Sequence, residues 1–534
     1  MKKLLYIFCI SILMVLPTSI RSDCSSSCDT SCDTSCNSSS TTDCHSCECQ
    51  VTSKSFLSIR PYFEAASPVK VSLVRSEMDE LRCHNGSLFQ IVPFGGKTTK
   101  GYRLGQYFGP SCKRILKVTE VQEDDTDILS GQLNIDTINN NFESTFSLTP
   151  QQTFAGVGFN YRTHFGYKDQ DKGFFIDVTL PVYHVRNTMN LCETIINNGG
   201  GPKPENVGSV TAAFQQSSWC FGKIDDCEDT THTGVSELDL QLGYGWGKDQ
   251  SFMHSYIGVI IPTGNRVKSQ KVFEPIIGWN HNTAIHFGSS FGIELWESKC
   301  GKYTIWYELA IDSRYFFENK QIRSFDLKNK PWSRYMMTYA NLAQAQQADT
   351  EQSITLGTPG INIFTQPVKV RPRFQRTYNT AFALDLVNWN LEAGYNFFTR
   401  DTECVKLACP WEQLVGVKYQ NVDGVLTPID GPALKALDGL GFTNSVQQIG
   451  NDYGLANNVA VANYASNIIT EDQLDLSSAE APCILSQRLY GSVGYAFDTC
   501  RFRTLLGVGG DYEFAGDNTG INRWGVWGKV ALIF

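Results

Sequence analysis

Long segments in which apolar and polar residues alternate recur along this chain, and they constrain its fold more than any other feature. Alternation at every second residue is the pattern of a β-strand with two different faces. Most of these segments run ten to fourteen residues, whereas strands of soluble proteins average about five or six. A tilted strand needs about 9–11 residues to cross a bilayer. The segment length therefore favours strands that cross a membrane.

Eleven segments carry the alternation, and we predict a strand over each of them: Thr153–Gly166, Lys172–Val185, Val235–Trp246, Ser251–Ile261, Thr283–Trp296, Tyr303–Phe316, Tyr378–Val387, Trp389–Thr399, Gln487–Phe497, Phe502–Phe514 and Arg523–Phe534. Ser55–Phe63 is a weaker twelfth segment, because Pro61 removes a backbone donor and limits a strand to an edge or an end. Bacterial membrane barrels have an even number of strands. We predict about twelve, within a range of 12–16.

The connections between these segments alternate in length, which is a second and independent sign of a barrel. The short ones are Tyr167–Asp171, Gly247–Gln250, Glu297–Lys302, the turn at Asn388 and Asp498–Arg501. The long ones cover about 64–152, 186–234, 262–282, 317–377, 400–486 and 515–522. Membrane barrels have short periplasmic turns and longer external loops, whereas a soluble β-sandwich or propeller has no reason to sort its connections. The sequence predicts an all-β, antiparallel, up-and-down transmembrane barrel with long external loops that contain short helices.

The last predicted strand, RWGVWGKVALIF, ends the chain at a phenylalanine. With this ending, residues 55–534 resemble Gram-negative outer-membrane β-barrel proteins. The resemblance implies a location in the bacterial outer membrane, contact with outer-membrane lipid, and recognition by the barrel-assembly machinery through Val526, Val530, Leu532 and Phe534. A looser likeness, which rests on cysteine count and architecture, is to the cysteine-rich major porins of chlamydia-like bacteria.

The start of the chain has the layout of an exported protein. Two lysines, an apolar run from Leu4 to Leu16 and then small residues indicate a signal peptide over residues 1–22. We assign residues 23–50 to a low-complexity, cysteine-rich periplasmic tail and residues 51–534 to the barrel. No later apolar run reaches about 18 residues, the usual length of a membrane-spanning helix, and the mean hydropathy is -0.22. The net charge of -9 argues against a nucleic-acid partner.

Eighteen cysteines fit an oxidising, exported location. In the tail, thiolates with His45 could bind zinc or Cu(I), but disulfides are favoured in such a compartment. If both termini are periplasmic, the tail shares a side with two short turns. This set has nine members, so at least one is left for another chain: Cys24, Cys28, Cys32, Cys36, Cys44, Cys47, Cys49, Cys300 and Cys500. We therefore predict disulfide-linked copies or links to other envelope proteins.

The remaining eight cysteines fall in the predicted long external connections and could join loops internally: Cys83, Cys112, Cys192, Cys220, Cys227, Cys404, Cys409 and Cys483. Loop segments at Met336–Gln347, Ala433–Leu440 and within Asn457–Asn467 have helical composition. Either of the two long connections that contain these segments, about 317–377 and 400–486, could fold inward as a constriction or plug. Ser87–Pro110, with its glycine turns, could add a short hairpin there.

Charged residues on the strands must face the lumen, because a basic side chain at the bilayer midplane costs about 2–4 kcal/mol and an acidic one less. Each could either line a wet pore or pair with a neighbour inside the barrel. As a set, their acidic excess predicts a mild cation preference if the pore is open. The candidates are Glu237, Asp239, Glu294, Glu308, Asp312, Arg314, Asp385, Glu392, Arg501, Arg503, Asp511, Glu513 and Lys529.

Two functions remain open from the sequence. The first is a channel for passive or weakly selective passage of small hydrophilic solutes. The second is a structural or adhesive surface barrel, cross-linked by disulfides and without an open pore. We do not expect an enzyme or a cofactor, because His254, His281 and His286 have no serine and aspartate partners that can be placed at a common rim.

Overall fold

The computed structural model describes residues 53–534, except 75–85, 112, 121–127, 167–171, 205, 225–229, 249, 329, 340–356, 414, 418–419, 423–424, 428–468, 499–501 and 517–518. The described residues belong to one compact unit, Cys49–Phe534. The predicted signal peptide and cysteine-rich tail lie outside the described residues. So do the helices predicted over 433–440 and within 457–467.

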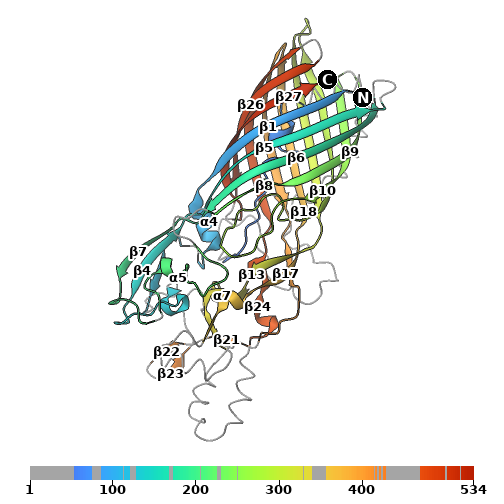
Figure 1. Ribbon diagram of the computed structural model, residues 1–534. Helices are drawn as coiled ribbons and strands as arrows, with labels where there is room; N and C mark the ends of the chain where they lie inside the picture. The colour runs from blue at the N-terminus through green and yellow to red at the C-terminus, as the bar shows by residue number, and fades with distance from the viewer. Residues whose placement is uncertain are drawn as a thin grey trace. The chain divides into compact units, whose positions relative to one another are not determined.

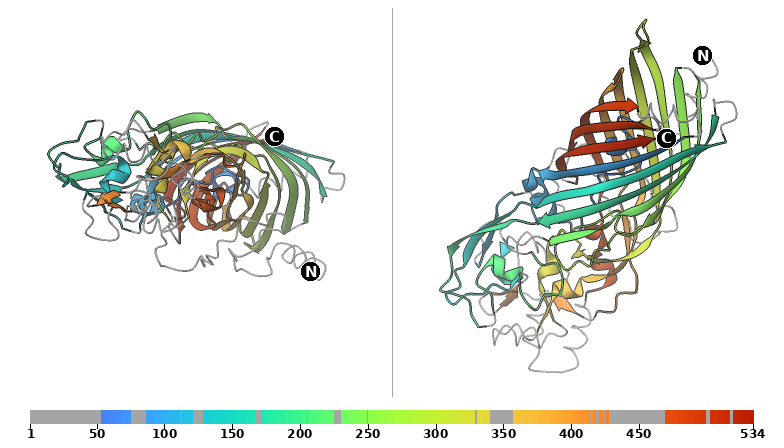
Figure 2. Two further views of the ribbon diagram at one scale, coloured as in Figure 1. Left: turned by 90° about the horizontal axis from the view of Figure 1, so that it is seen from below. Right: turned by 45° about the horizontal axis from the view of Figure 1, so that its top comes forward.

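Twelve strands close into a barrel (Figures 1 and 2). The sheet has thirteen strands, but β8 (Thr230–Val235) pairs only with β6, so twelve form the ring. These are β1 (Ser87–Thr99), β5 (Gln151–Phe165), β6 (Lys172–Thr188), β9 (Glu237–Lys248), β10 (Ser251–Pro262), β11 (Ala284–Glu297), β12 (Tyr303–Phe316), β18 (Arg373–Leu386), β19 (Trp389–Arg400), β25 (Ile484–Asp498), β26 (Arg503–Ala515) and β27 (Asn522–Ile533).

All pairings around the ring are antiparallel, and each strand pairs with the next barrel strand in the chain. The ring closes where β27 pairs with β1, for example at Phe89↔Leu532. The predicted all-β, up-and-down barrel of about twelve strands is therefore confirmed. One end, called the short-turn end, carries brief connections such as the one from Glu297 to Tyr303. The other, called the long-connection end, carries the large ones.

The first strand of the ring is not the predicted one. Ser55–Phe63 forms no strand, and the ring instead begins with Ser87–Thr99, where we expected a loop hairpin. The physical reason is that Ser55–Phe63 contacts protein on both of its faces, because its first residues lie in the layer and the rest lie inside the barrel. β1 has a weak alternation because Pro93 interrupts it. At this point the β1–β27 pairing is interrupted between Ile91 and Phe94, and it resumes in the same register.

Beyond the long-connection end, the connections fold into a second group of elements, which we call the layer (Figure 1). Its helices are α4 (Gly101–Phe108), α5 (Val210–Ala213) and α7 (Gly360–Ile363), with 3-10 turns η3 (Ser130–Leu133), η4 (Ser333–Tyr335), η6 (Glu471–Gln473) and η7 (Leu476–Ala479). Its strands are β2 (Leu116–Thr119), β3 (Ile128–Leu129), β4 (Glu143–Leu148), β7 (Leu191–Asn197), β13 (Asn319–Ser324), β14 (Asp326–Leu327), β15 (Met337–Tyr339), β16 (Thr358–Pro359), β17 (Thr365–Arg371), β20 (Cys404–Leu407), β21 (Gly416–Val417), β22 (Gln420–Val422), β23 (Val425–Thr427) and β24 (Leu474–Asp475).

The layer has its own hydrophobic core, in which the rings of Phe214, Trp219, Trp332 and Tyr335 pack against one another. The helix predicted from Met336 is not formed where the chain is described, because Met337–Tyr339 is the strand β15. No helix within the described ranges is long and apolar enough to span a membrane. Because it has a shared hydrophobic core, the layer is a folded structure and not a set of separate loops.

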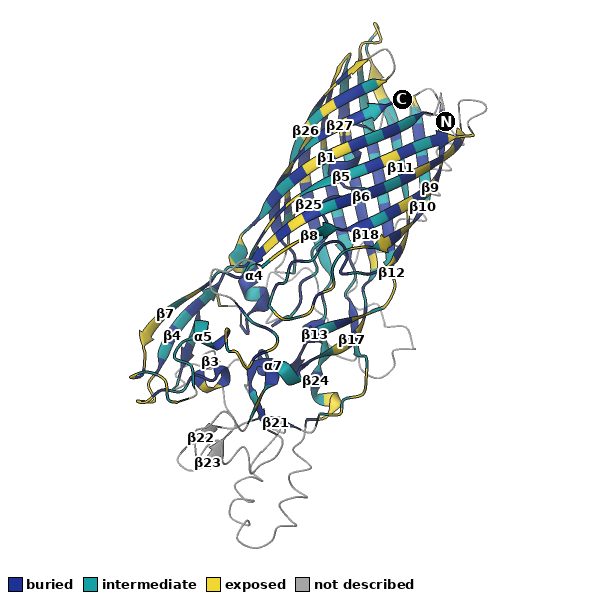
Figure 3. Cartoon of the chain, viewed as in Figure 1, coloured by how far each residue is buried: buried dark blue, intermediate teal, exposed yellow. Residues whose placement is uncertain are grey.

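The wall of the barrel alternates between buried and exposed residues, as the banding in Figure 3 shows. The outward side chains are large and apolar; Leu242, Phe382 and Val508 are 52–59% exposed. Aromatic pairs occupy both ends of the wall, with Trp389 against Tyr495 at the short-turn end and Tyr315 against Phe374 at the other. Such girdles flank the apolar band of membrane barrels.

Candidate functional site

The lumen is filled by the part of the chain that precedes the first strand. This segment, Ser53–Val74, contains one short helix, α2 (Pro68–Val71), and takes no part in the barrel sheet. We call it the N-terminal plug. Every residue from Arg60 to Val74 is buried. The plug is the feature that decides what the barrel can do.

The plug runs along the lumen from one end to the other. At the long-connection end, Ser53 Oγ donates a hydrogen bond of 2.9 Å to Asp326 Oδ2 in the layer. At the short-turn end, Leu73 and Val74 pack in a cluster with Ile533 at the end of the last strand. The plug therefore extends between the two ends of the lumen.

The first charged contact joins the plug to the strands opposite β1. Arg314 of β12 pairs with Glu64 of the plug, and both side chains are almost fully buried. Beside it, His286 bridges two carboxylates: its Nδ1 lies 2.8 Å from Asp312 Oδ2 and its Nε2 lies 2.9 Å from Asp239 Oδ1. Buried charges require such partners, because an unpaired ion away from water is costly. The wall carboxylates here are paired and do not face an open channel.

A second cluster surrounds Glu513 of β26. Its Oε2 accepts from Arg488 Nη2 at 2.9 Å and from Arg523 Nε at 2.7 Å. The plug adds a third cation, since Arg60 Nε lies 3.7 Å from Glu513 Oε1. Three guanidinium groups therefore share this one carboxylate, and the plug contributes to the charge balance of the wall.

A third cluster holds the part of the plug that lies nearer the short-turn end. Lys70 Nζ lies 3.0 Å from Asp177 Oδ1, and the other oxygen of Asp177 accepts from Arg162 Nε at 2.8 Å. From β27, three strands away around the ring, Lys529 Nζ donates to the backbone carbonyls of Lys70, at 2.9 Å, and of Ser72. The plug is thus bound by side chain and by backbone on two sides of the barrel.

Shape adds to charge, because inward-facing glycines make room for aromatic side chains of the plug. A Cβ at Gly525 would overlap the ring of Tyr62, and a Cβ at Gly158 would overlap the ring of Phe63. Both rings are essentially inaccessible to solvent. The wall therefore has cavities that match these two rings.

Nine of the thirteen charged candidates are buried within the barrel: Glu237, Asp239, Glu308, Asp312, Arg314, Glu392, Asp511, Glu513 and Lys529. Glu294, Asp385 and Arg503 are half-buried on strands near the short-turn end. Arg501 lies outside the described residues. Their role as a pore lining stays a prediction.

Sequence reasoning did not select four wall residues that bind or surround the plug: Arg162, Asp177, Arg488 and Arg523. The alternation alone would have found them, because each lies on the face opposite the large apolar residues of its strand. The plug residues Arg60, Glu64 and Lys70 were missed for a different reason. The segment has no regular period that marks it as the filling of a barrel.

The described thiols lie at both ends of the barrel. Cys192, Cys220 and Cys409 are exposed thiols of the layer, whereas Cys300 is exposed in a short turn. No disulfide forms within the part of the chain that the structure describes. Cys83, Cys112, Cys227, Cys500 and the seven tail cysteines lie outside the described residues, so the predicted cross-links stay predictions.

The predicted assembly signal lies on the outer surface of the last strand. Val526, Val530 and Phe534 are 40–58% exposed, and Leu532 is half-buried. Their side chains occupy alternate positions of β27 and its end, on the face that contacts lipid. They are therefore placed where another protein or the membrane can reach them.

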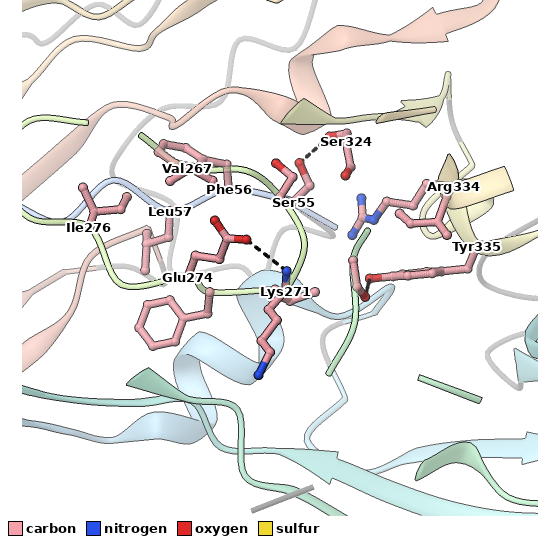
Figure 4. A pocket seen from close by; sticks show the side chains of 15 residues that line it. Ser55, Phe56, Leu57, Val267, Lys271, Glu274, Ile276, Ser324, Arg334 and Tyr335 are labelled. Carbon is pink, nitrogen blue, oxygen red and sulfur yellow. Dashed lines mark hydrogen bonds between the residues drawn. The ribbon is translucent and has the colours of Figure 1, made fainter. Parts of the chain in front are cut away.

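Where the plug enters the layer, the packing leaves a small cavity of about 20 Å³ (Figure 4). Ser55 donates a hydrogen bond to the carbonyl of Ser324 on one side of it. On the other side, the backbone N–H of Lys271 donates to Glu274 at 3.1 Å. A cavity of this size holds about one water molecule. It is a packing gap and does not continue the lumen to the outside.

The architecture identifies the compartment. A closed antiparallel barrel of twelve strands, apolar outside and polar inside, is the form that bacterial outer-membrane proteins take. Among β-sheets, only a closed one satisfies every backbone hydrogen bond in lipid. The predicted location in the bacterial outer membrane is confirmed on these grounds.

Comparison with known proteins gives only distant similarities. No family model and no curated protein matches the chain. Among solved structures, an outer membrane channel from Pseudomonas putida F1 is 8% identical, with a TM-score of 0.36, over 84% of this chain and 96% of that one. The transport unit of the autotransporter AIDA-I from Escherichia coli is 5% identical, with a TM-score of 0.31, over 86% and 96%. A FadL homologue from Pseudomonas aeruginosa is 7% identical, with a TM-score of 0.28, over 84% and 90%.

Proposed function

We propose that this protein is an outer-membrane barrel that its own N-terminal plug keeps closed, and that it anchors a folded layer at the cell surface. The observation that carries this proposal is the filled lumen. A twelve-stranded barrel is wider than the eight-stranded size that wall side chains alone fill. Here the plug occupies the additional space.

The plug has the character of a built component. Its charges meet opposite charges of the wall in three separate clusters, and two of its rings occupy cavities that glycines provide. Breaking a buried ion pair by removing one partner costs about 3–5 kcal/mol of stability. Spontaneous loss of the whole plug would break several such pairs, which argues for a closed resting state.

A gated channel for small hydrophilic solutes is the second candidate. It is favoured by the way the plug is held, because Arg60–Val74 makes no strand pairing with the wall and is bound mainly through side chains. Water can replace polar side-chain contacts of this kind. If a signal withdrew the plug, the charged wall of the lumen would be exposed.

Conductance of the purified full-length protein in planar bilayers tests both candidates. We expect no steady open level from the full chain, and steady levels from a variant that lacks residues 53–74. Circular dichroism and heat-dependent gel mobility establish that the variant is a folded barrel. If the variant without the plug does not fold, a milder variant, Glu64→Gln with Lys70→Gln, replaces it. We expect brief openings from this variant.

The outcomes separate the candidates. A steady open level from the full chain would contradict a closed resting barrel and support a simple channel. Silence from a folded variant without the plug would contradict the gated channel, because the layer would then close the barrel by itself.

A further inference from the structure

A row of lysines crosses a small sheet of the layer. In this sheet β17 is the central strand, with β13 on one side and β20 on the other. The antiparallel registers place Lys320 of β13 opposite Lys369 of β17, and Lys369 opposite Lys406 of β20. Residues directly opposite each other in a sheet lie on the same face, with Cβ atoms about 4.5–5.5 Å apart. The three lysines, which we call the lysine row, therefore share one face.

The face that carries the lysine row is turned to solvent, and the other face belongs to the core of the layer. Lys320 and Lys369 are exposed and Lys406 is half-buried, whereas Val368 and Val370 are fully buried. Like charges directly opposite one another destabilise a sheet. The stability of the layer therefore does not explain the row, and an anion beside it would offset the repulsion.

The charge of this sheet is opposite to that of the whole chain. The net charge of the chain is -9, but the three strands contain no acidic residue and these basic ones: Lys320, Arg323, Lys369, Arg371 and Lys406. On the buried face, Arg323 pairs with Glu403. At the edge of the sheet, Arg371 pairs with Glu318 at 3.6 Å. Among the described residues, Lys320 and Lys369 form no ion pair.

The lysine row lies close to the end of the membrane-facing wall. β12 ends at Phe316 and β13 begins at Asn319, so the sheet follows the barrel beyond its long-connection end (Figure 1). Between these strands, Phe317 is 44% exposed and packs against Tyr315 of the aromatic girdle. Lys320 follows Phe317 by three residues, which is at most about 10 Å of extended chain. The headgroup region of one leaflet is about 5–8 Å thick, so the Lys320 side chain reaches the headgroup level.

We propose that the lysine row is an interaction surface for phosphorylated lipid headgroups. Phosphate groups at the membrane surface provide the opposite charge at this height, and each Lys or Arg near an anionic surface strengthens binding. Ile322 and Pro367, which pair on the same face, add apolar contacts beside the charges. The choice of leaflet rests on the proposed function: because the layer is at the cell surface, the lipid belongs to the outer leaflet.

Lipid binding by the purified full-length protein in a neutral detergent tests the proposal. The probes are lipid A that carries its phosphates, dephosphorylated lipid A and inorganic pyrophosphate, and native mass spectrometry measures the bound fraction of each. The test variant is Lys320→Gln with Lys369→Gln, and a second variant with arginine at both positions keeps the charge. The matched control, Lys299→Gln with Lys302→Gln, removes two exposed lysines at the short-turn end. Heat-dependent gel mobility shows that each variant is folded.

We expect phosphorylated lipid A to bind equally to the wild type, the control and the arginine variant, and about 30-fold more weakly to the glutamine variant. Equal binding of the two forms of lipid A, or equal affinity of the test and control variants for the phosphorylated form, would overturn the proposal. Pyrophosphate binding as tight as that of lipid A would assign the row to a soluble phosphate and overturn the lipid partner. Such failures would leave the closed barrel intact, because its test is conductance.

Discussion

At the scale of single residues, two side chains in the last strand show why the lumen had to be filled. Trp527 and Ile533 break the apolar alternation of the strand because they face inward. Trp527 packs in a cluster that contains Tyr62 of the plug, and Ile533 packs with Leu73. Large apolar residues on an inward face indicate protein in the lumen and not water.

The Gly525→Ala substitution should destabilise the closed barrel. The new methyl group would overlap the Tyr62 ring, and overpacking of this kind costs about 1–3 kcal/mol. We expect the gel mobility to change from that of the folded to that of the unfolded protein at a lower temperature. The matched control is Gly491→Ala, whose nearest neighbour would lie 3.8 Å away. Equal effects of the two substitutions would contradict the fit between ring and glycine.

The Asp177→Asn substitution should have a larger effect. It leaves Lys70 and Arg162 buried beside a neutral amide, and loss of one partner of a buried pair costs about 3–5 kcal/mol. Unfolding in denaturant measures the loss. Asp401→Asn serves as the control, because its pair with Arg376 is half-exposed and surface pairs contribute about 0–1 kcal/mol. A stability close to that of the control would show that the plug is loosely held.

At the scale of elements, the strands could be read from the sequence because lipid imposes a strict rule on them. Every second residue must be apolar, so eleven strands were predicted within a few residues of their observed ends. The plug follows no such rule. Its residues contact protein on all sides. Apolar residues such as Phe56, Leu57, Ile59 and Tyr62 therefore suggested a strand where the structure has none.

The candidate site was predictable in part for the same reason. Alternation places a charged residue such as Asp312 or Glu513 inside the barrel, which is where nine candidates lie. It does not give the partner across the lumen. Glu64 is 250 residues from Arg314 in the chain, and only the path of the plug brings the two together.

The layer contains an element whose stability should depend on pH. Glu480, at the end of η7, accepts from the backbone N–H of Val405 at 3.1 Å. Burial raises the pKa of its carboxyl to about 7, although Lys54 opposes the rise. The unfolded group titrates near 4.5. Stability is therefore greatest below this value, falls as pH rises toward 7, and is constant above it, with a total loss on the order of 3 kcal/mol.

Hydrogen exchange of residues 469–483 at about pH 5 and about pH 8 checks this prediction, because amide protection follows local stability. After correction for intrinsic exchange rates, we expect weaker protection at the higher pH. Glu480→Gln should remove the difference, whereas Glu412→Gln, at an exposed position, should keep it. The same pH difference in both variants would assign it to another group.

At the scale of the whole molecule, closure of the ring depends on the last strand, which pairs with both β26 and β1. If the chain end is also read during assembly, Phe534→Ala should lower the amount of barrel in the outer membrane severalfold. Membrane fractionation with heat-dependent gel mobility measures this amount. Phe317→Ala is the control, since Phe317 is also exposed but lies directly after β12, at the long-connection end of the barrel. Equal yields would remove Phe534 from the assembly signal.

The lack of strand pairing between the plug and the wall gives this barrel an unusual mechanical character. A force applied to the N-terminal end would break the side-chain contacts of the plug one after another. The barrel strands, joined edge to edge, would share the same load. The twenty-two residues of the plug, at about 3.3–3.6 Å each when extended, would then reach roughly 75 Å from Val74 while the cylinder stayed whole.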